Sequence, residues 1–410
     1  MVEPAPLSQK HPTSYPKQHT MSHYTHIING KPASSSSTLD VQNPATQKKI
    51  AEVPVATKDQ LDEAVAAARA PFQHGQLSLR TNAHSVMLLE TAKLRVPEKV
   101  IIDNEQVRIT ERRVPIRSVR RYRPMEFPSN AGGDKNWTRS LSGQYPVLKP
   151  SPFTPLTTLR LVKDIQKVVP PGVSFTGSTD TGKRVMASAS TGLKRLTLEL
   201  GNIILPDVDV VKIVPEMFWA ALINNGQTCV AAKRLLSRPA MAPTRIAAWP
   251  RPEPHAYKKV LSFFEDAKAN GYKFVTGGDV NPNPTDGLFI PASFVDNPPE
   301  DSKIVREEPF GPIVPLLKWS DETDVIKRAN DTNMGLASSV WGKDLVAVER
   351  IAKQIEAGGG CMHERVQPSH SICGLGGHKE SGIGVENGLN GLLSYSNIQT
   401  LTLKKQPTFV

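Results

Sequence analysis

Two side chains that could do chemistry, Cys229 and Glu199, lie thirty residues apart in this 410-residue chain. Cys229 ends the run Asn-Asn-Gly-Gln-Thr-Cys, and we expect it at the start of a helix, where the helix field would favour a thiolate able to attack a carbonyl carbon. Glu199 closes a short apolar strand at 196–200, a position that suits a general base with a raised pKa. Taken alone, the thiol has a commoner alternative, which is an inert buried cysteine.

Five strings in one order extend this pattern. They are Phe-Thr-Gly-Ser-Thr at 175–179, Leu-Glu-Leu-Gly at 198–201, Asn-Gly-Gln-Thr-Cys at 225–229, Glu-Glu-Pro-Phe-Gly-Pro at 307–312 and Lys-Glu-Ser-Gly-Ile-Gly at 379–384. Together they resemble the NAD(P)-dependent aldehyde dehydrogenase family. The resemblance implies an α/β, aldehyde dehydrogenase-like fold with a Rossmann-type nucleotide-binding domain, an α/β catalytic domain and a small oligomerisation strand region.

The resemblance also divides the chain. It implies a nucleotide-binding domain at 23–205, a catalytic domain at 206–385, and a C-terminal helix with an oligomerisation strand at 386–410. Residues 1–22 contain four prolines and few apolar residues, which predicts a disordered tail. The nucleotide-binding domain is incomplete, because residues 95–140 match no part of the family. We therefore interpret the chain as a shortened, divergent member.

Seven residues take family roles by this resemblance. Cys229 would carry a thiohemiacetal and then a thioester, and Glu199 would activate water to hydrolyse the thioester. The cofactor, NAD or NADP, would contact Lys149 at the adenosine ribose, Gly177 and Ser178 at the phosphates, Glu308 at the nicotinamide ribose and Phe310 at the nicotinamide ring. From the residues alone, a surface lysine, a capped helix and an ordinary turn stay open as alternatives for these sites.

Two departures from the family leave the activity open. The Pro-Trp-Asn segment whose Asn helps to form the oxyanion hole has no convincing equivalent, and loss of one such donor typically costs ~10²–10³ in rate. Pro152 stands where NAD-preferring relatives carry a ribose-binding Glu, so NADP stays open. We predict NAD(P)-dependent oxidation of an aldehyde to a carboxylic acid. The alternative is a catalytically impaired relative kept for oligomerisation or nucleotide binding.

The charge of the chain is uneven. The formal net charge is +11, and the excess gathers in the Arg-rich segment 107–123. This segment could suggest nucleic-acid binding, but it contains a single aromatic residue, Tyr122, and fits no reader motif. We expect a solvated strand pair or an irregular insert there and no nucleic-acid partner. The expected partners are a small-molecule aldehyde and further copies of the chain, in a homodimer or homotetramer.

The cysteines and the hydropathy limit other classes of function. The three cysteines, Cys229, Cys361 and Cys373, show neither a disulfide nor a metal-binding pattern, so we expect no metal, a reducing cytoplasmic location and structural roles for the latter two. No run approaches the ~18 apolar residues of a membrane span.

Local patterns predict individual elements. The Asn-Gly pair at 29–30 predicts a hairpin, and Thr57 with Gln60 predicts a capping box for a helix that ends before Pro71. Further elements are an amphipathic helix at 257–269, strands at 273–276 and 288–290, a helical face from 345 to the glycine run at 358–360, and a terminal strand at 400–403.

Overall fold

The computed structural model describes residues 24–29, 31–67, 98–115, 119–122, 146–152, 154–156, 159, 203–229, 231–237, 249–250, 254–281, 287–363, 374–382, 384–386, 388–393 and 396–405. The tail predicted at 1–22 lies outside these residues. So do the strings that contain Gly177, Ser178 and Glu199.

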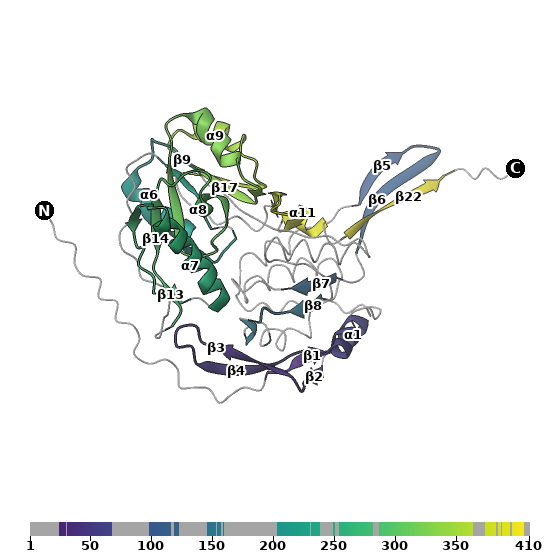
Figure 1. Cartoon of the computed structure of the whole chain (residues 1–410). Helices are drawn as coiled ribbons and strands as arrows, with labels where there is room; N and C mark the ends of the chain where they lie inside the picture. The colour runs from purple at the N-terminus through teal and green to yellow at the C-terminus, as the bar shows by residue number, and fades with distance from the viewer. Residues whose placement is uncertain are drawn as a thin grey trace.

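A seven-stranded sheet organises the middle of the chain (Figure 1). Its order is β12-β14-β15-β10-β9-β17-β18, and all neighbours are parallel except β12 and β14. The strands are β9 Ile203–Ile204, β10 Leu235–Ser237, β12 Phe274–Thr276, β14 Ser293–Asp296, β15 Ile313–Lys318, β17 Ala337–Trp341 and β18 Gly359–His363. Helices between the strands make this an α/β fold, as the sequence predicts.

Successive residues of these strands enter two different cores. Ile203 and Val340 pack in one buried cluster, whereas the next residues, Ile204 and Trp341, pack in a second cluster. A strand side chain points to the opposite face from its neighbour, so both faces of this sheet are covered. The near-continuous apolar runs of the strands follow from that double coverage.

The helices are divided between the two faces. The cluster with Ile203 includes residues of α7 Pro254–Ala269, α8 Lys303–Arg306, α9 Glu322–Asn330 and α10 Leu345–Ala352. The cluster with Ile204 includes Ile213 and Met217 of α6 Val210–Leu222. On α7, the buried residues Tyr257, Val260, Leu261 and Phe264 recur at helical spacing, which confirms the amphipathic helix predicted at 257–269.

Asp side chains define where three of these helices begin. Asp209, Asp321 and Asp344 each accept a hydrogen bond from a backbone N–H in the first turn of α6, α9 and α10, at 2.8 to 3.4 Å. Such caps satisfy amides that have no partner inside the helix. The helical face predicted from residue 345 is shorter than expected: α10 ends at Ala352, and the last two glycines of the run at 358–360 begin β18.

The N-terminal part forms paired strands and a capped helix. Its elements are β1 His26–Ile28, β2 Lys31–Ala33, β3 Thr38–Gln42, β4 Lys49–Pro54 and α1 Lys58–Ala67. β1 and β2 form the predicted hairpin, with Asn29 in the left-handed region at φ 48°. The capping box is confirmed, because Gln60 N donates to Thr57 Oγ1 at 3.2 Å and Thr57 N donates to Gln60 Oε1 at 3.1 Å.

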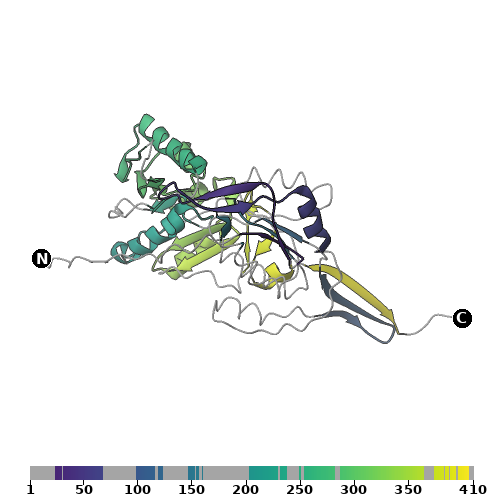
Figure 2. The same cartoon turned by 90° about the horizontal axis from the view of Figure 1, so that it is seen from below.

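A three-stranded arm projects from the rest of the molecule (Figures 1 and 2). It consists of β5 Lys99–Asp103, β6 Val107–Pro115 and β22 Ser396–Lys404, in the order β22-β6-β5. The Arg-rich segment 107–123 contains strand β6, but the partners of β6 lie outside the segment: β5 precedes it and β22 is near the C-terminus, so the predicted strand pair is met only in part. The predicted terminal strand is β22. The pairing of β22 with β6 was not predicted, because the sequence indicated the terminal strand but not its partner.

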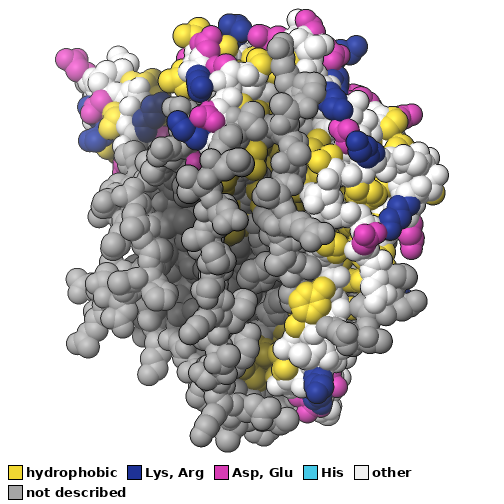
Figure 3. All heavy atoms as spheres, turned by 90° about the vertical axis from the view of Figure 1, so that its left-hand side faces the viewer, with side chains coloured by type: hydrophobic (Ala, Val, Ile, Leu, Met, Phe, Trp, Pro, Cys, Tyr) yellow, Lys and Arg dark blue, Asp and Glu magenta, His cyan; other side chains and the backbone are white. Residues whose placement is uncertain are grey.

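Short elements complete the described part. They are β7 Val119–Tyr122 with β8 Pro146–Lys149, β11 Trp249–Pro250 with β13 Phe289–Ile290, β16 Met334–Gly335 with β20 His378–Lys379, β19 Leu375–Gly376 with β21 Val385–Glu386, and α11 Gly388–Leu393. Among the helices described, none is long and apolar enough to cross a membrane. On the face in Figure 3, acidic and basic side chains intermingle over the coloured surface.

Candidate active site

A strained turn after α6 carries Cys229. The helix α6 runs into the 3₁₀ turn η1 Ile223–Gly226, where Asn224 and Asn225 have φ values of 50° and 58° and Gly226 has 69°. Three consecutive residues with positive φ reverse the chain sharply, and Asn and Gly are the residue types that tolerate this region. The reversal places Cys229, which is half-buried, ahead of the central strand β10.

The helix N-terminus predicted at Cys229 is absent from this part of the described chain. Thr228 accepts a turn hydrogen bond from Ala231 N at 3.1 Å, Ala232 N donates to Ala220 O at 2.9 Å, and the chain then enters β10. The prediction was wrong because the small residues after the thiol form a turn that docks against the end of α6. A helix N-terminus therefore does not stabilise the thiolate of Cys229, and other groups would have to favour it.

The turn lies in backbone contact with the loop that holds the predicted cofactor residues. A Cβ atom built on Gly226 would lie 2.4 Å from Gly311 O, so only glycine permits this approach. Glu308 and Phe310 belong to the same loop, and Phe310 itself has a positive φ of 52°. The structure thus brings the thiol turn together with two predicted cofactor residues that are about eighty positions away in sequence.

A buried lysine, Lys233, bridges the two segments. Its ammonium donates a 2.7 Å hydrogen bond to Gly226 O and lies 3.6 Å from Glu308 Oε1. It also lies 5.1 Å from the centre of the Phe310 ring, within the range of a cation–π contact. The Lys233 side chain is 8 % exposed, so these interactions are little screened by solvent.

Glu308 is half-buried, and its Oε1 atom is buried. Burial raises the pKa of its carboxyl, while the ammonium groups of Lys233 and Lys259 oppose the rise. Lys259, on α7, also donates to the backbone oxygen of Glu308 at 2.8 Å. Glu308 Oε1 is buried and has no hydrogen-bond donor among the described residues, and the same holds for Gln227 Oε1 beside the thiol. A hydroxyl group of a ligand could satisfy such an acceptor.

The side chains of the remaining predicted site residues are not described by the structure. Lys149 ends strand β8, which pairs in parallel with β7, but only its backbone is described. Gly177, Ser178 and Glu199 lie outside the described residues, so their roles stay predictions. In the described chain, no group of three or more His, Cys, Asp or Glu side chains could hold a metal ion.

The comparison with known sequences decides the family. The profile of the "Aldehyde dehydrogenase family" matches residues 31–95, 171–249 and 244–401, which is more than half of the chain. The chain belongs to the aldehyde dehydrogenase family. Aldehyde dehydrogenase LUC3 of a Fusarium species is 29% identical over 462 residues, covering 93% of this chain and 99% of that protein. Betaine aldehyde dehydrogenase of Bacillus subtilis is 30% identical, with coverages of 73% and 71%.

Solved structures agree with this membership. An aldehyde dehydrogenase of Mycobacterium tuberculosis complexed with NAD⁺ matches with a TM-score of 0.82 and 25% identity, covering 95% of this chain and 100% of that one. The NAD⁺ complex of an aldehyde dehydrogenase from Bacillus cereus matches with a TM-score of 0.81 and 24% identity, covering 94% and 97%. The fold of this chain is therefore the α/β fold of aldehyde dehydrogenases.

Two basic residues near the thiol were not predicted as site residues. Lys233 and Arg234 lie four and five residues after Cys229, between Ala231-Ala232 and the strand β10. A pair of cations entering a buried parallel strand is itself a signal, because charged residues are almost never fully buried without partners. That signal could have identified both as residues with fixed interactions.

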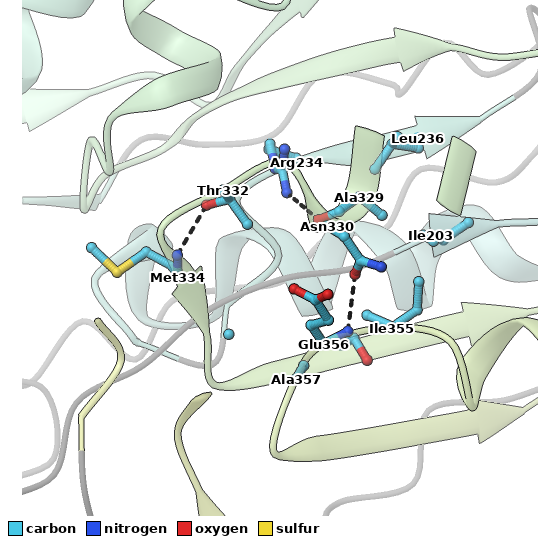
Figure 4. A pocket seen from close by; sticks show the side chains of 12 residues that line it. Ile203, Arg234, Leu236, Ala329, Asn330, Thr332, Met334, Ile355, Glu356 and Ala357 are labelled. Atoms are coloured by element: carbon cyan, nitrogen blue, oxygen red, sulfur yellow. Dashed lines mark hydrogen bonds between the residues drawn. The ribbon is translucent and has the colours of Figure 1, made fainter. Parts of the chain in front are cut away.

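Arg234, the next residue, stabilises the C-terminal end of helix α9. Its guanidinium donates to Arg328 O at 3.2 Å and to Ala329 O at 2.8 Å, so it binds the last carbonyls of α9. Figure 4 shows Arg234 beside Ala329 and Asn330 in a small pocket. Burial lowers the pKa of Arg234, as expected for a cation taken out of water. Lys233 thus binds the turn that carries Cys229, whereas Arg234 binds the C-terminal end of α9.

Proposed function

We propose that this chain oxidises an aldehyde to a carboxylic acid with NAD or NADP, using Cys229 as the nucleophile. The observation that carries the proposal is the backbone contact between Gly226, in the thiol turn, and Gly311, in the loop of Glu308 and Phe310. A thiol and a cofactor site must lie together if a substrate bound to sulfur is to lose a hydride. Family membership supplies the reaction class, and the NAD⁺ complexes of the matched structures support the cofactor.

The residues of the described site fit a dinucleotide cofactor. Glu308 Oε1 is a buried acceptor with no hydrogen-bond donor in the described part of the chain, which suits a ribose hydroxyl. The Phe310 ring offers an apolar surface for a flat heterocycle, and Lys149 would contact the adenosine ribose. When bound, the cofactor would supply the acceptor for a hydride. Pro152, in the place of an acidic ribose ligand, leaves NADP open.

The chemistry then follows from the thiol. The Cys229 thiolate adds to the aldehyde carbon and forms a thiohemiacetal, and transfer of the carbon-bound hydride with its electron pair leaves a thioester. Glu199 takes a proton from water, the water oxygen attacks the thioester carbon, and the carbon–sulfur bond breaks. The products are the carboxylic acid and the restored thiolate. The Cys229 backbone amide would be one oxyanion donor.

The test is the absorbance of the reduced nicotinamide. Purified protein is mixed with NAD⁺ or NADP⁺ and a panel of aliphatic and aromatic aldehydes, and Cys229→Ala is compared with Cys361→Ala. Cys361 lies on β18 and is expected to be structural, so its variant controls for the loss of a thiol. Turnover that requires Cys229 and persists without Cys361 supports the proposal.

The alternative makes a different prediction for the same assay. A catalytically impaired relative would be folded, would show no turnover with any aldehyde or either cofactor, and would still bind dinucleotide. Isothermal titration with NAD⁺ and NADP⁺ separates this outcome from loss of the whole site. Folded protein without turnover would overturn the proposed oxidation.

We further propose that the arm joins two copies of this chain. β5 and β22 are the outer strands of the arm, and strand edges without a partner are pairing sites. Apolar side chains are exposed on both strands: Val100, Ile101, Ile102, Ile398, Leu401 and Leu403. Exposed apolar residues on an extended ribbon favour burial against a second subunit. A homodimer or homotetramer is therefore expected.

A further inference from the structure

One lysine contacts both halves of the proposed site. Lys233 Nζ donates to Gly226 O in the thiol turn and lies 3.6 Å from the Glu308 carboxylate in the cofactor loop. We propose that Lys233 is a positioning residue, which holds the thiol turn and the Glu308–Phe310 loop in one fixed relation and keeps the Glu308 carboxylate ready to accept a hydrogen bond from the cofactor. This inference rests on the proposed function and assigns it a further residue.

The geometry gives Lys233 little freedom. An ammonium that is 8 % exposed must satisfy its donors inside the protein, since unpaired buried charges are strongly unfavourable. Its contacts are with three groups on two segments: the Gly226 carbonyl in the thiol turn, and the Glu308 carboxylate and the Phe310 ring in the cofactor loop. If either segment moved relative to the other, at least one of these contacts would break. The ammonium therefore opposes independent motion of the two segments.

The charges around Glu308 give the inference a pH signature. Lys233 from the thiol side and Lys259 from α7 are the charged groups that act on the carboxyl, and both favour its ionised form. Lys259 is exposed and binds the Glu308 backbone oxygen, whereas Lys233 is buried and faces the carboxylate. As the pH falls, protonation of Glu308 should weaken cofactor binding, and we call this fall in affinity the acid limb. Loss of the Lys233 charge should move the acid limb to higher pH, because Glu308 would take up a proton more readily.

The first experiment measures the affinity for NAD⁺ and NADP⁺ by isothermal titration, from pH 5 to 9, for wild type, Lys233→Met and Lys303→Met. Lys303 is a matched control, because its ammonium also lies over an aromatic ring but its contacts are on α7: it donates to Ser262 Oγ at 2.9 Å and lies 4.8 Å from the Phe263 ring. We expect Lys233→Met to weaken binding about tenfold near neutral pH, equal to about 1.4 kcal/mol. Lys303→Met should bind as wild type does.

A double-mutant cycle shows whether Lys233 acts through Glu308. In a Glu308→Gln background, Lys233→Met should weaken binding less than about twofold, because the carboxylate it serves is already gone. Equal weakening in both backgrounds, or an unmoved acid limb, overturns the positioning role. If Lys233→Met does not fold, Lys233→Gln gives the same comparison, since its amide can still donate to Gly226 O but carries no charge for Glu308.

Hydrogen–deuterium exchange tests the coupling without cofactor or turnover. Peptides covering 223–229 and 307–312 should both exchange faster in Lys233→Met than in wild type, and neither should change in Lys303→Met. An unchanged 307–312 peptide would overturn the link between the segments. Because this readout needs no aldehyde and no dinucleotide, a wild type that fails to oxidise aldehydes would refute the proposed function and leave the Lys233 inference to be decided by exchange.

Discussion

Gly226 and Gly311 approach each other so closely that a side chain on Gly226 would lie 2.4 Å from the Gly311 carbonyl oxygen. This contact joins the end of the thiol turn to the loop that follows α8. It is the point at which two motifs separated in sequence become one site. Its consequence can be measured, because the contact excludes every residue except glycine at position 226.

Gly226→Ala should destabilise the protein and impair the proposed reaction. An alanine there has both an unfavourable φ of 69° and a clash, together worth about 2–4 kcal/mol. Gly271→Ala is the matched control, because Gly271 has the same φ of 69° but nothing within 4 Å of an added Cβ. Urea unfolding of both variants separates the cost of the conformation from the cost of the contact. Equal losses in the two variants would contradict the close approach.

Glu308→Gln should change how stability depends on pH. The pKa of Glu308 is raised in the folded state by burial, so the folded protein takes up a proton at this site more readily than the unfolded chain. Stability of the wild type should therefore fall as pH rises from roughly 4.3, the ordinary Glu value, to the folded pKa, and stay lower above it. Glu308→Gln should lack this fall.

The measurement is the urea midpoint of each protein between pH 3.5 and 8. Glu307→Gln serves as the control, because Glu307 is the neighbouring carboxylate and is exposed. The slope with pH is the informative quantity, since Glu308→Gln also removes the charged partner of the buried Lys233 and so shifts the whole curve. A wild type that gains stability relative to Glu308→Gln as pH rises would mean that the lysines outweigh burial.

Arg234→Met should loosen the C-terminal end of α9. The substitution removes two charge-assisted hydrogen bonds, to Arg328 O and Ala329 O, at a cost of about 2–4 kcal/mol. Arg350→Met is a suitable comparison, since Arg350 makes an exposed pair with Glu322 that water and salt screen, so its loss should cost less. Chemical denaturation should rank the two losses in that order, and the reverse order would contradict the capping role of Arg234.

Leu401→Lys together with Leu403→Lys should reduce the size of the assembly. Both side chains are exposed on β22, and charges there would repel a second subunit from the apolar face of the arm. Light scattering coupled to size exclusion gives the mass of each form. Val346→Lys, on α10, replaces an apolar residue that is 74 % exposed and should leave the mass unchanged. An unaltered mass in the β22 variant would exclude this surface of the arm from the interface.

Local sequence patterns determined much of the fold. The capping box of Thr57 and Gln60 and the hairpin turn at Asn29 were predicted and are present, because each needs only a few neighbouring residues. The same holds for the amphipathic helix α7, whose apolar spacing is visible in the chain itself. The helix expected after Cys229 failed for the opposite reason: docking of Ala232 against α6 decided the local conformation.

The sequence by itself determined the family, since five strings in order were sufficient, and it named Cys229, Glu308 and Phe310 as site residues. Only the tertiary structure decided that Lys233 connects the thiol turn to Glu308 and that the divergent segment pairs with β22, where Arg112 Nε donates to Gln399 Oε1 across 287 positions. The physical reason is the distance along the chain over which each feature is decided. A cap or an amphipathic period is set by neighbours along the chain, whereas the partner of a buried charge or of a strand edge is set by which distant segments the sheet brings together.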